Sequence, residues 1–170
     1  GGDINWMTSG SGIIHSEGPT DAFIEKGATV ELLQIWINLP SDKKQLPASF
    51  RHYAGNSLPV VQKNNANVKV LIGEYDGNTS PVQTHTPMFA YLISLKAGEL
   101  FTMPVDNSYS SALYILNGKI NVLNEKLQAG QLVDFMHNGD QVVFSATEDA
   151  EVLAFGGLPI KEKVVSYGPF

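Results

Sequence analysis

The sequence contains no cysteine, carries fewer basic than acidic side chains, and has no long apolar run. Without cysteine the chain cannot form disulfide scaffolds, cysteine zinc sites or thiol nucleophiles. Its 11 Lys and Arg against 17 Asp and Glu give a net charge of −6. Because no basic cluster offsets this charge, direct nucleic-acid binding is not expected. Every apolar run is interrupted before the roughly 18–20 residues of a membrane span, so we expect no membrane insertion and a cytoplasmic location.

What the chain has instead is frequent interruption, with 16 Gly and 9 Pro spread over 170 residues. These breakers fall at intervals too short for most helices, which predicts an all-β protein with less than a tenth of its residues in helices. Short strands at this spacing are typical of a sandwich or a small barrel. Strands are predicted at 29–39, 68–72, 88–95, 111–116, 119–123, 131–135, 141–146 and 150–155.

One turn stands out in the second half of the chain. Asn117-Gly118 separates two predicted strands, and both residue types tolerate the positive φ of a type I′ turn. We therefore predict a hairpin over 113–123. The polar stretch 136–140, which contains His137, is interpreted as a second hairpin loop.

The stretch 47–67 is rich in Pro, Asn and Ser and has little periodicity, so it is predicted to be a linker. It divides the chain into a short piece, 1–46, and a longer one, 68–170, that has enough strands to close on itself. The chain begins at Gly1 without an initiator Met, which we interpret as processing, a tag remnant or an internal fragment.

The sharpest local feature is His15-Ser16-Glu17, preceded by two isoleucines. In a strand, residues i and i+2 share a face, so an imidazole and a carboxylate would converge closely enough to bind one metal ion. The alternative is a solvated polar pair at a strand end. No His-x-His occurs anywhere to complete a metal site.

The other histidines have separate surroundings in the sequence. His52 lies in the predicted linker and is expected to be exposed, whereas His85 precedes a strand and is expected to shape a turn by hydrogen bonding. No Gly-x-Ser-x-Gly elbow supports nucleophilic hydrolysis. The stretch Gly10–Gly12 lacks the helix and the Lys-Ser/Thr of a phosphate loop, which excludes phosphoryl transfer.

Several blocks of the sequence together resemble the pirin family, a group of two-domain cupins. The blocks are Gly2–Gly10, Gly12–Glu17, Leu33–Pro40 and Tyr167–Phe170. They lie at family-like spacing and cover essentially the whole chain. The resemblance implies an all-β cupin fold, a jelly-roll barrel or double-stranded β-helix, with one near-complete C-terminal cupin and part of an N-terminal cupin.

The resemblance also implies a metal site. In this family the N-terminal cupin binds one metal, usually iron, through a His-x-His pair followed by the His and Glu of the block seen here, so His15 and Glu17 are the implied metal ligands. The His-x-His strands would precede Gly1 and a helical tail would follow Phe170, so the chain is expected to be truncated at both ends. Fe(II), or another divalent transition metal, is then expected to bind weakly or not at all in this fragment. The second cupin, 68–170, is expected to lack metal ligands.

Three functions follow from the resemblance. The first is a quercetin 2,3-dioxygenase-like enzyme, active if the missing strands are present, that oxidises a flavonol with Glu17 as the base on the substrate hydroxyl. The second is a non-enzymatic regulatory module that binds partner proteins. The third is an inactive structural remnant. From the incomplete first barrel we also expect self-association through open strand edges.

Overall fold

The chain is almost entirely built from strands in the computed structural model, which describes residues 2–27, 29–63, 65–165 and 167. About 7% of the chain is helical, which confirms the predicted all-β, cupin-type fold. Within the described residues, no helix is long and apolar enough to cross a membrane. Apart from Tyr167, the final block of the family resemblance (Tyr167–Phe170) lies outside the described residues.

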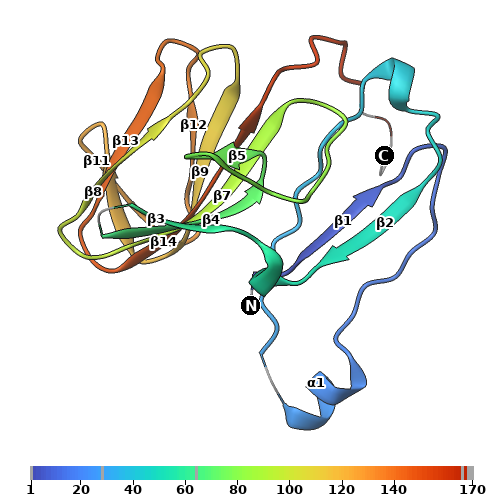
Figure 1. Cartoon of the computed structure of the whole chain (residues 1–170), viewed down its shortest axis with the longest axis horizontal. Coiled ribbons are helices and arrows are strands. Elements are labelled where there is room, and N and C mark those ends of the chain that lie inside the picture. The colour runs from blue at the N-terminus through green and yellow to red at the C-terminus, as the bar shows by residue number, and fades with distance from the viewer. Residues whose placement is uncertain (1, 28, 64, 166, 168–170) are drawn as a thin grey trace.

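The larger of two main sheets has six antiparallel strands (Figure 1). Their order is β12 (Leu132–Phe135), β9 (Ser110–Asn117), β14 (Ala150–Gly157), β7 (Met88–Leu95), β4 (Ala66–Ile72) and β3 (Val60–Lys63). Buried and more exposed residues alternate along β4, as expected for a strand with one face on a core. The predicted strands at 68–72, 88–95, 111–116, 131–135 and 150–155 are confirmed, with small shifts at their ends.

The smaller sheet has four antiparallel strands and encloses the core together with the larger one. Its order is β11 (Glu125–Gln128), β10 (Lys119–Val122), β13 (Gln141–Ala146) and β8 (Leu100–Pro104). The strands predicted at 119–123 and 141–146 are therefore present. Phe101 of β8 and Phe144 of β13 are almost fully buried, with ring centroids 5.6 Å apart. Burying an aromatic side chain of this kind contributes about 1.5–3 kcal/mol to folding.

The hairpin predicted at Asn117-Gly118 is wrong. β9 pairs with β12 and β14, whereas β10 pairs with β11 and β13, so the chain passes here from the larger sheet to the smaller one. Gly118 has φ +79°, and a Cβ on it would lie 2.3 Å from the carbonyl oxygen of Asp149. An Asn-Gly pair suits a corner between sheets as well as a hairpin, because both need a positive φ.

The loop 136–140 likewise joins strands of different sheets, β12 and β13, and is not a hairpin loop. The tight hairpins lie elsewhere. Leu123 and Asn124, with φ of 48° and 72°, link β10 to β11. Asp76 and Gly77, with φ of 50° and 76°, link β5 (Glu74–Tyr75) to β6 (Asn78–Thr79). Two consecutive positive φ values are the mark of a type I′ turn.

The N-terminal part of the chain packs on the outer face of the six-stranded sheet. β1 (Ile4–Thr8) pairs with β2 (Ser49–Tyr53) in a separate two-stranded sheet, seen to the right of the barrel in Figure 1. Ile4, Trp6 and Tyr53 contact a small cluster formed by Ile72, Val82 and Ala90. Two short 3-10 helices, η1 (Ser41–Lys43) and η2 (Gly55–Ser57), flank β2. The carboxylate of Glu162 accepts hydrogen bonds from the backbone N–H and the hydroxyl of Ser41.

The strand predicted at 29–39 is not observed. Residues 29–40 have no regular secondary structure and pair with no described strand. Several of their large apolar side chains are exposed, with Trp36 81% and Leu32 65% exposed. A strand needs a neighbour for its backbone groups, so β-propensity alone did not decide the outcome. The preceding helix α1 (Asp21–Lys26) buries none of its residues and stands away from the barrel in Figure 1.

The stretch 47–67, predicted as a linker, contains regular structure: β2, η2, β3 and the first residues of β4. Alternation is weak in β2 because four of its five residues are exposed, and this hid the strand in the sequence. The division of the chain into two units at this stretch stays a prediction.

Candidate functional site

The two predicted metal ligands lie in an irregular segment between β1 and α1. The side chains of His15 and Glu17 are both exposed, and residues 12–20 form no strand. The expectation that strand geometry would place them on one face is therefore not realised, because no described strand runs beside this segment to pair with it. The carboxylate of Glu17 accepts a long hydrogen bond, 3.5 Å, from the side-chain amide of Gln34.

These two side chains fit part of a metal site. An imidazole nitrogen and a carboxylate oxygen are donors that non-haem Fe(II) takes, but the two-His-one-carboxylate arrangement needs a third protein ligand. Among the described residues, no group of three or more His, Cys, Asp or Glu side chains is placed to hold a metal ion. His15 and Glu17 thus suit a site that other residues would complete.

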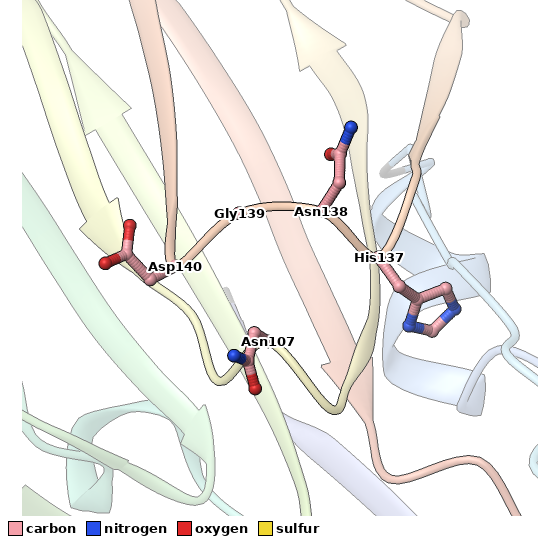
Figure 2. A pocket seen from close by; sticks show the side chains of 5 residues that line it. All are labelled: Asn107, His137, Asn138, Gly139 and Asp140. Atoms are coloured by element: carbon pink, nitrogen blue, oxygen red, sulfur yellow. The ribbon is translucent and has the colours of Figure 1, made fainter.

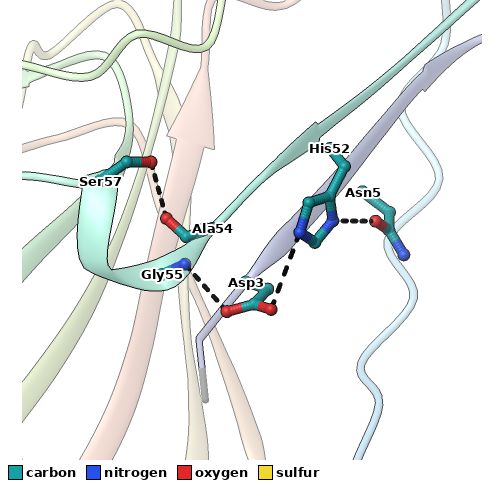
Figure 3. A network of polar contacts seen from close by, with 6 residues as sticks. All are labelled: Asp3, Asn5, His52, Ala54, Gly55 and Ser57. Carbon is teal, nitrogen blue, oxygen red and sulfur yellow. Dashed lines mark hydrogen bonds and ion pairs between the residues drawn. The ribbon is translucent and has the colours of Figure 1, made fainter.

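His52 is exposed, as predicted, but it lies on β2 and joins a polar network with β1 (Figure 3). Its Nδ1 lies 2.9 Å from the amide oxygen of Asn5, and its Nε2 lies 3.8 Å from the carboxylate of Asp3. The same carboxylate accepts the backbone N–H of Gly55 at 2.8 Å. These contacts tie the start of β1 to the end of β2, which gives His52 a structural role.

His85 adds a polar contact between the N-terminal part and the barrel. Its Nε2 lies 3.3 Å from the hydroxyl of the buried Thr8, and its carbonyl oxygen accepts a 2.6 Å hydrogen bond from the ammonium of Lys43. The expectation that His85 shapes a local turn by a side-chain hydrogen bond is wrong. Its partners are distant in sequence rather than within the local turn.

A surface hollow of about 700 Å³ lies at one end of the barrel. Two loops line it, one carrying Asn107 and the other His137, Asn138, Gly139 and Asp140 (Figure 2). A second hollow of about 510 Å³ adjoins it through His137 and Asn138. The sequence marked only residues 136–140 as a turn and gave no role to Asn107, because nothing in a single sequence shows that the two loops meet.

The interior of the barrel is apolar and aromatic. Its buried core cluster consists of aliphatic, Met, Phe and Tyr side chains, and the buried polar side chains among the described residues are Thr8, Ser80 and Ser111. Burial is the main cause that raises the pKa of Tyr91 to about 12, and it also raises the pKa of Tyr75, so both phenols are neutral at physiological pH.

Comparison with known proteins gives matches along the whole chain. The family description "Pirin" matches residues 1–37, and "Pirin C-terminal cupin domain" matches residues 90–170. Pirin-1 of Arabidopsis thaliana is 35% identical over 99% of this chain and 59% of its own length. A crystal structure of quercetin 2,3-dioxygenase from Acinetobacter baumannii is 28% identical, with a TM-score of 0.93 over 99% of this chain and 60% of that one.

A crystal structure of the protein GK1651 from Geobacillus kaustophilus is 30% identical, with a TM-score of 0.84 over 95% of this chain and 66% of that one. The chain spans less than two thirds of the length of the curated relatives it matches. The matches begin in the N-terminal segment that carries His15 and continue through the barrel, in the order that the sequence blocks predict. The chain belongs to the pirin family of cupin proteins.

Proposed function

We propose that this chain carries part of the metal site of a flavonol dioxygenase of the quercetin 2,3-dioxygenase type. In this proposal His15 and Glu17 bind Fe(II) or another divalent transition metal, and the remaining ligands come from outside the described residues. The observation that carries the proposal is the similarity of nearly the whole chain to the crystal structure of quercetin 2,3-dioxygenase from Acinetobacter baumannii. The placement of an imidazole and a carboxylate two residues apart on one exposed segment supports it.

Each side chain has a defined task in this proposal. When bound, the metal ion supplies open positions at which a flavonol oxygen and O₂ can be held and activated. His15 donates a ring nitrogen to the metal, and only the neutral imidazole can do so. Glu17 takes the proton of the flavonol hydroxyl as a general base, and the amide of Gln34 orients its carboxylate.

Metal titration of the 170-residue chain tests the ligand assignment. Two ligands give weak binding, which His15→Ala and Glu17→Gln abolish, because each substitution removes one of the two donors. His52→Ala and Glu31→Gln replace exposed side chains of the same types elsewhere and serve as matched controls that leave binding unchanged. Equal binding by the His15→Ala variant overturns the assignment, and tight stoichiometric iron after dialysis overturns the two-ligand site.

Activity is measured separately on quercetin, by the loss of its absorbance under air. The 170-residue chain with added Fe(II) shows no turnover, because its site lacks ligands. A longer protein that contains this sequence shows turnover, and His15→Ala abolishes it. Turnover by the His15→Ala variant of such a protein would refute the proposed role.

A protein-binding module is the second candidate function. Residues 30–37 carry several large apolar side chains that are exposed, and exposed apolar patches of this kind mark interaction surfaces. Under this alternative, substitutions in residues 30–37 abolish partner binding while His15→Ala leaves it intact. Loss of partner binding in the His15→Ala variant would contradict a metal-independent module.

A further inference from the structure

We propose that Asn138 is a site of spontaneous deamidation in the folded protein, and that the fold protects Asn117 from the same reaction. The sequence contains two Asn-Gly dipeptides, Asn117-Gly118 and Asn138-Gly139. They are chemically equivalent in the unfolded chain. Both Asn residues are exposed, but the structure holds their backbones differently, so the fold itself decides which of them reacts.

The reaction needs only the protein and water. The backbone nitrogen that follows the Asn attacks the side-chain amide carbon, the new C–N bond closes a five-membered succinimide, and the side-chain nitrogen leaves as ammonia. Water then opens the ring at either carbonyl, giving an aspartyl or an isoaspartyl residue, with no oxidation or reduction. A following Gly favours the attack because no side chain shields its nitrogen, but the Asn backbone must rotate to bring nitrogen and carbon together.

Asn138 meets these requirements. It is exposed, it lies in the bend 137–138 outside any strand, and in Figure 2 its side chain lies on the opposite side of its loop from Asn107. No hydrogen bond holds the N–H of Gly139 to any described residue. A Cβ built on Gly139 would find only the carbonyl oxygen of Gln141, at 3.9 Å, so the space around this glycine is open.

Contacts on either side hold the loop in place, and the N–H of Asn138 donates a 2.9 Å hydrogen bond to the carbonyl of Met136 within it, whereas the attacking N–H of Gly139 has no partner among the described residues. The ring nitrogen Nε2 of His137 lies 3.3 Å from the hydroxyl of Ser110. The carbonyl of Asp140 accepts a 2.9 Å hydrogen bond from the N–H of Val105. Backbone rotation at Asn138 therefore requires no strand to open.

Asn117 is held in the opposite way. It is the last residue of β9 and is paired with Glu151 of β14. The carbonyl of Gly118 accepts a 3.1 Å hydrogen bond from the N–H of Ala129, and a Cβ on Gly118 would lie 2.3 Å from the Asp149 carbonyl oxygen. Rotation here would push the chain into β14, so ring closure must wait for local opening of the sheet.

The product changes the chemistry of the hollow. The side-chain amide of Asn138 both donates and accepts hydrogen bonds, whereas a carboxylate only accepts them. The new carboxylate would lie in the same hollow as Asp140 and His137 and would add one negative charge to the net −6 of the chain. The isoaspartyl form also lengthens the backbone between the two anchored ends of the loop.

Peptide mapping by mass spectrometry after incubation of the folded chain in mildly alkaline buffer tests the proposal. We expect the peptide with Asn138 to convert to aspartyl and isoaspartyl forms at least about tenfold faster than the peptide with Asn117. The Gly139→Ala variant slows the conversion without disturbing the fold, since the φ of Gly139 is not positive and the site is open. In denaturant the two peptides should convert at similar rates.

Two outcomes would overturn the proposal. Equal conversion of the two peptides in the folded chain would show that the fold does not discriminate between them. Faster conversion of the Asn117 peptide would show that the corner at Gly118 opens more easily than the loop at Gly139. The denatured sample separates either result from an intrinsic difference between the two sequences.

Discussion

The buried hydroxyl of Tyr75 gives the sharpest test of how the barrel is held together. Tyr75 is 4% exposed, and its hydroxyl oxygen has no hydrogen-bond partner among the described atoms. Its ring packs edge-on against Tyr91, with centroids 5.2 Å apart, and stacks with Phe101 at 6.4 Å. Tyr75→Phe keeps these ring contacts and removes only the unpaired polar group.

The expected magnitude follows from two opposing terms. Leaving a buried hydroxyl without a partner costs about 1–3 kcal/mol, and removing it recovers that cost. A small loss of packing around the missing oxygen offsets part of the gain. We expect Tyr75→Phe to raise the free energy of unfolding by about 1 kcal/mol, or the melting temperature by about 2–4 °C for a chain of this size.

Tyr91→Phe is the matched control, because the same atom is removed where it does have a partner. The Tyr91 hydroxyl donates a 2.5 Å hydrogen bond to the carbonyl oxygen of Glu74, so its loss should lower the free energy of unfolding by about 1 kcal/mol. Urea unfolding at neutral pH, followed by fluorescence and circular dichroism, measures both variants. If Tyr75→Phe destabilises the protein by as much as Tyr91→Phe, the Tyr75 hydroxyl has a hidden partner, such as a buried water, and the reasoning is refuted.

Three further predictions concern pH, association and backbone strain. Burial raises the pKa of Tyr91 from 10 to about 12, so as the pH rises the tyrosine loses its proton in the unfolded state first. The free energy of unfolding should therefore fall between about pH 10 and 12. In Tyr91→Phe this decrease with pH should be smaller, and an unchanged decrease would contradict the prediction. The exposed apolar residues of 30–37 should drive self-association of the chain, measured by sedimentation velocity. The double substitution Trp36→Ser with Leu32→Ser should reduce this self-association. A wild-type chain that stays monomeric up to millimolar concentration would exclude it. Gly118→Ala should lower the free energy of unfolding by well over the roughly 1–2 kcal/mol that a positive φ alone costs an alanine. Gly77→Ala, at a similar φ with open space around it, should lower it by only that amount. Equal losses of stability in thermal unfolding would refute the steric argument.

The core strands could be predicted from the sequence because one physical signal marks them. In β7 the side chains of Phe89, Tyr91, Ile93 and Leu95 face the core at every second position, and this period is visible without knowledge of the partner strand. The segment 29–39 carries as much β-propensity as β7 but forms no strand. The two segments differ in strand pairing. Pairing depends on residues far away in the chain, so the sequence of the segment itself does not show it.

The Asn-Gly turn signal also gave a wrong prediction, because it depends on strand pairing that the local sequence does not show. Asn117-Gly118 reports that a positive φ is tolerated, but not whether the flanking strands pair with each other. The true two-residue turn at Leu123-Asn124 was hidden because Leu is an unfavourable residue at a positive φ, here 48°. At such positions the surrounding sheet imposes the local conformation.

The candidate sites show the same limit more strongly. The hollow at the end of the barrel depends on two loops whose closest lining residues, Asn107 and His137, are 30 positions apart in the chain. His15 and Glu17 were identified by spacing and by family resemblance, and the structure leaves both exposed without a third ligand among the described residues. Sequence spacing can identify two metal-ligand candidates, but only the fold determines which further ligands lie beside them.

The composition of the barrel interior limits where this chain can bind or transform a ligand. The buried tyrosines of the core, Tyr75 and Tyr91, are phenols held neutral by burial, so at neutral pH neither can act as a base. Imidazoles and carboxylates lie outside this buried core, for example on the N-terminal segment around His15 and in the hollow around His137. Changes in the barrel core and at His15 should therefore act independently, and the free-energy effects of Tyr75→Phe and His15→Ala should add within about 0.5 kcal/mol in the double variant. A clear departure from additivity would show that the segment of His15 is coupled to the barrel interior.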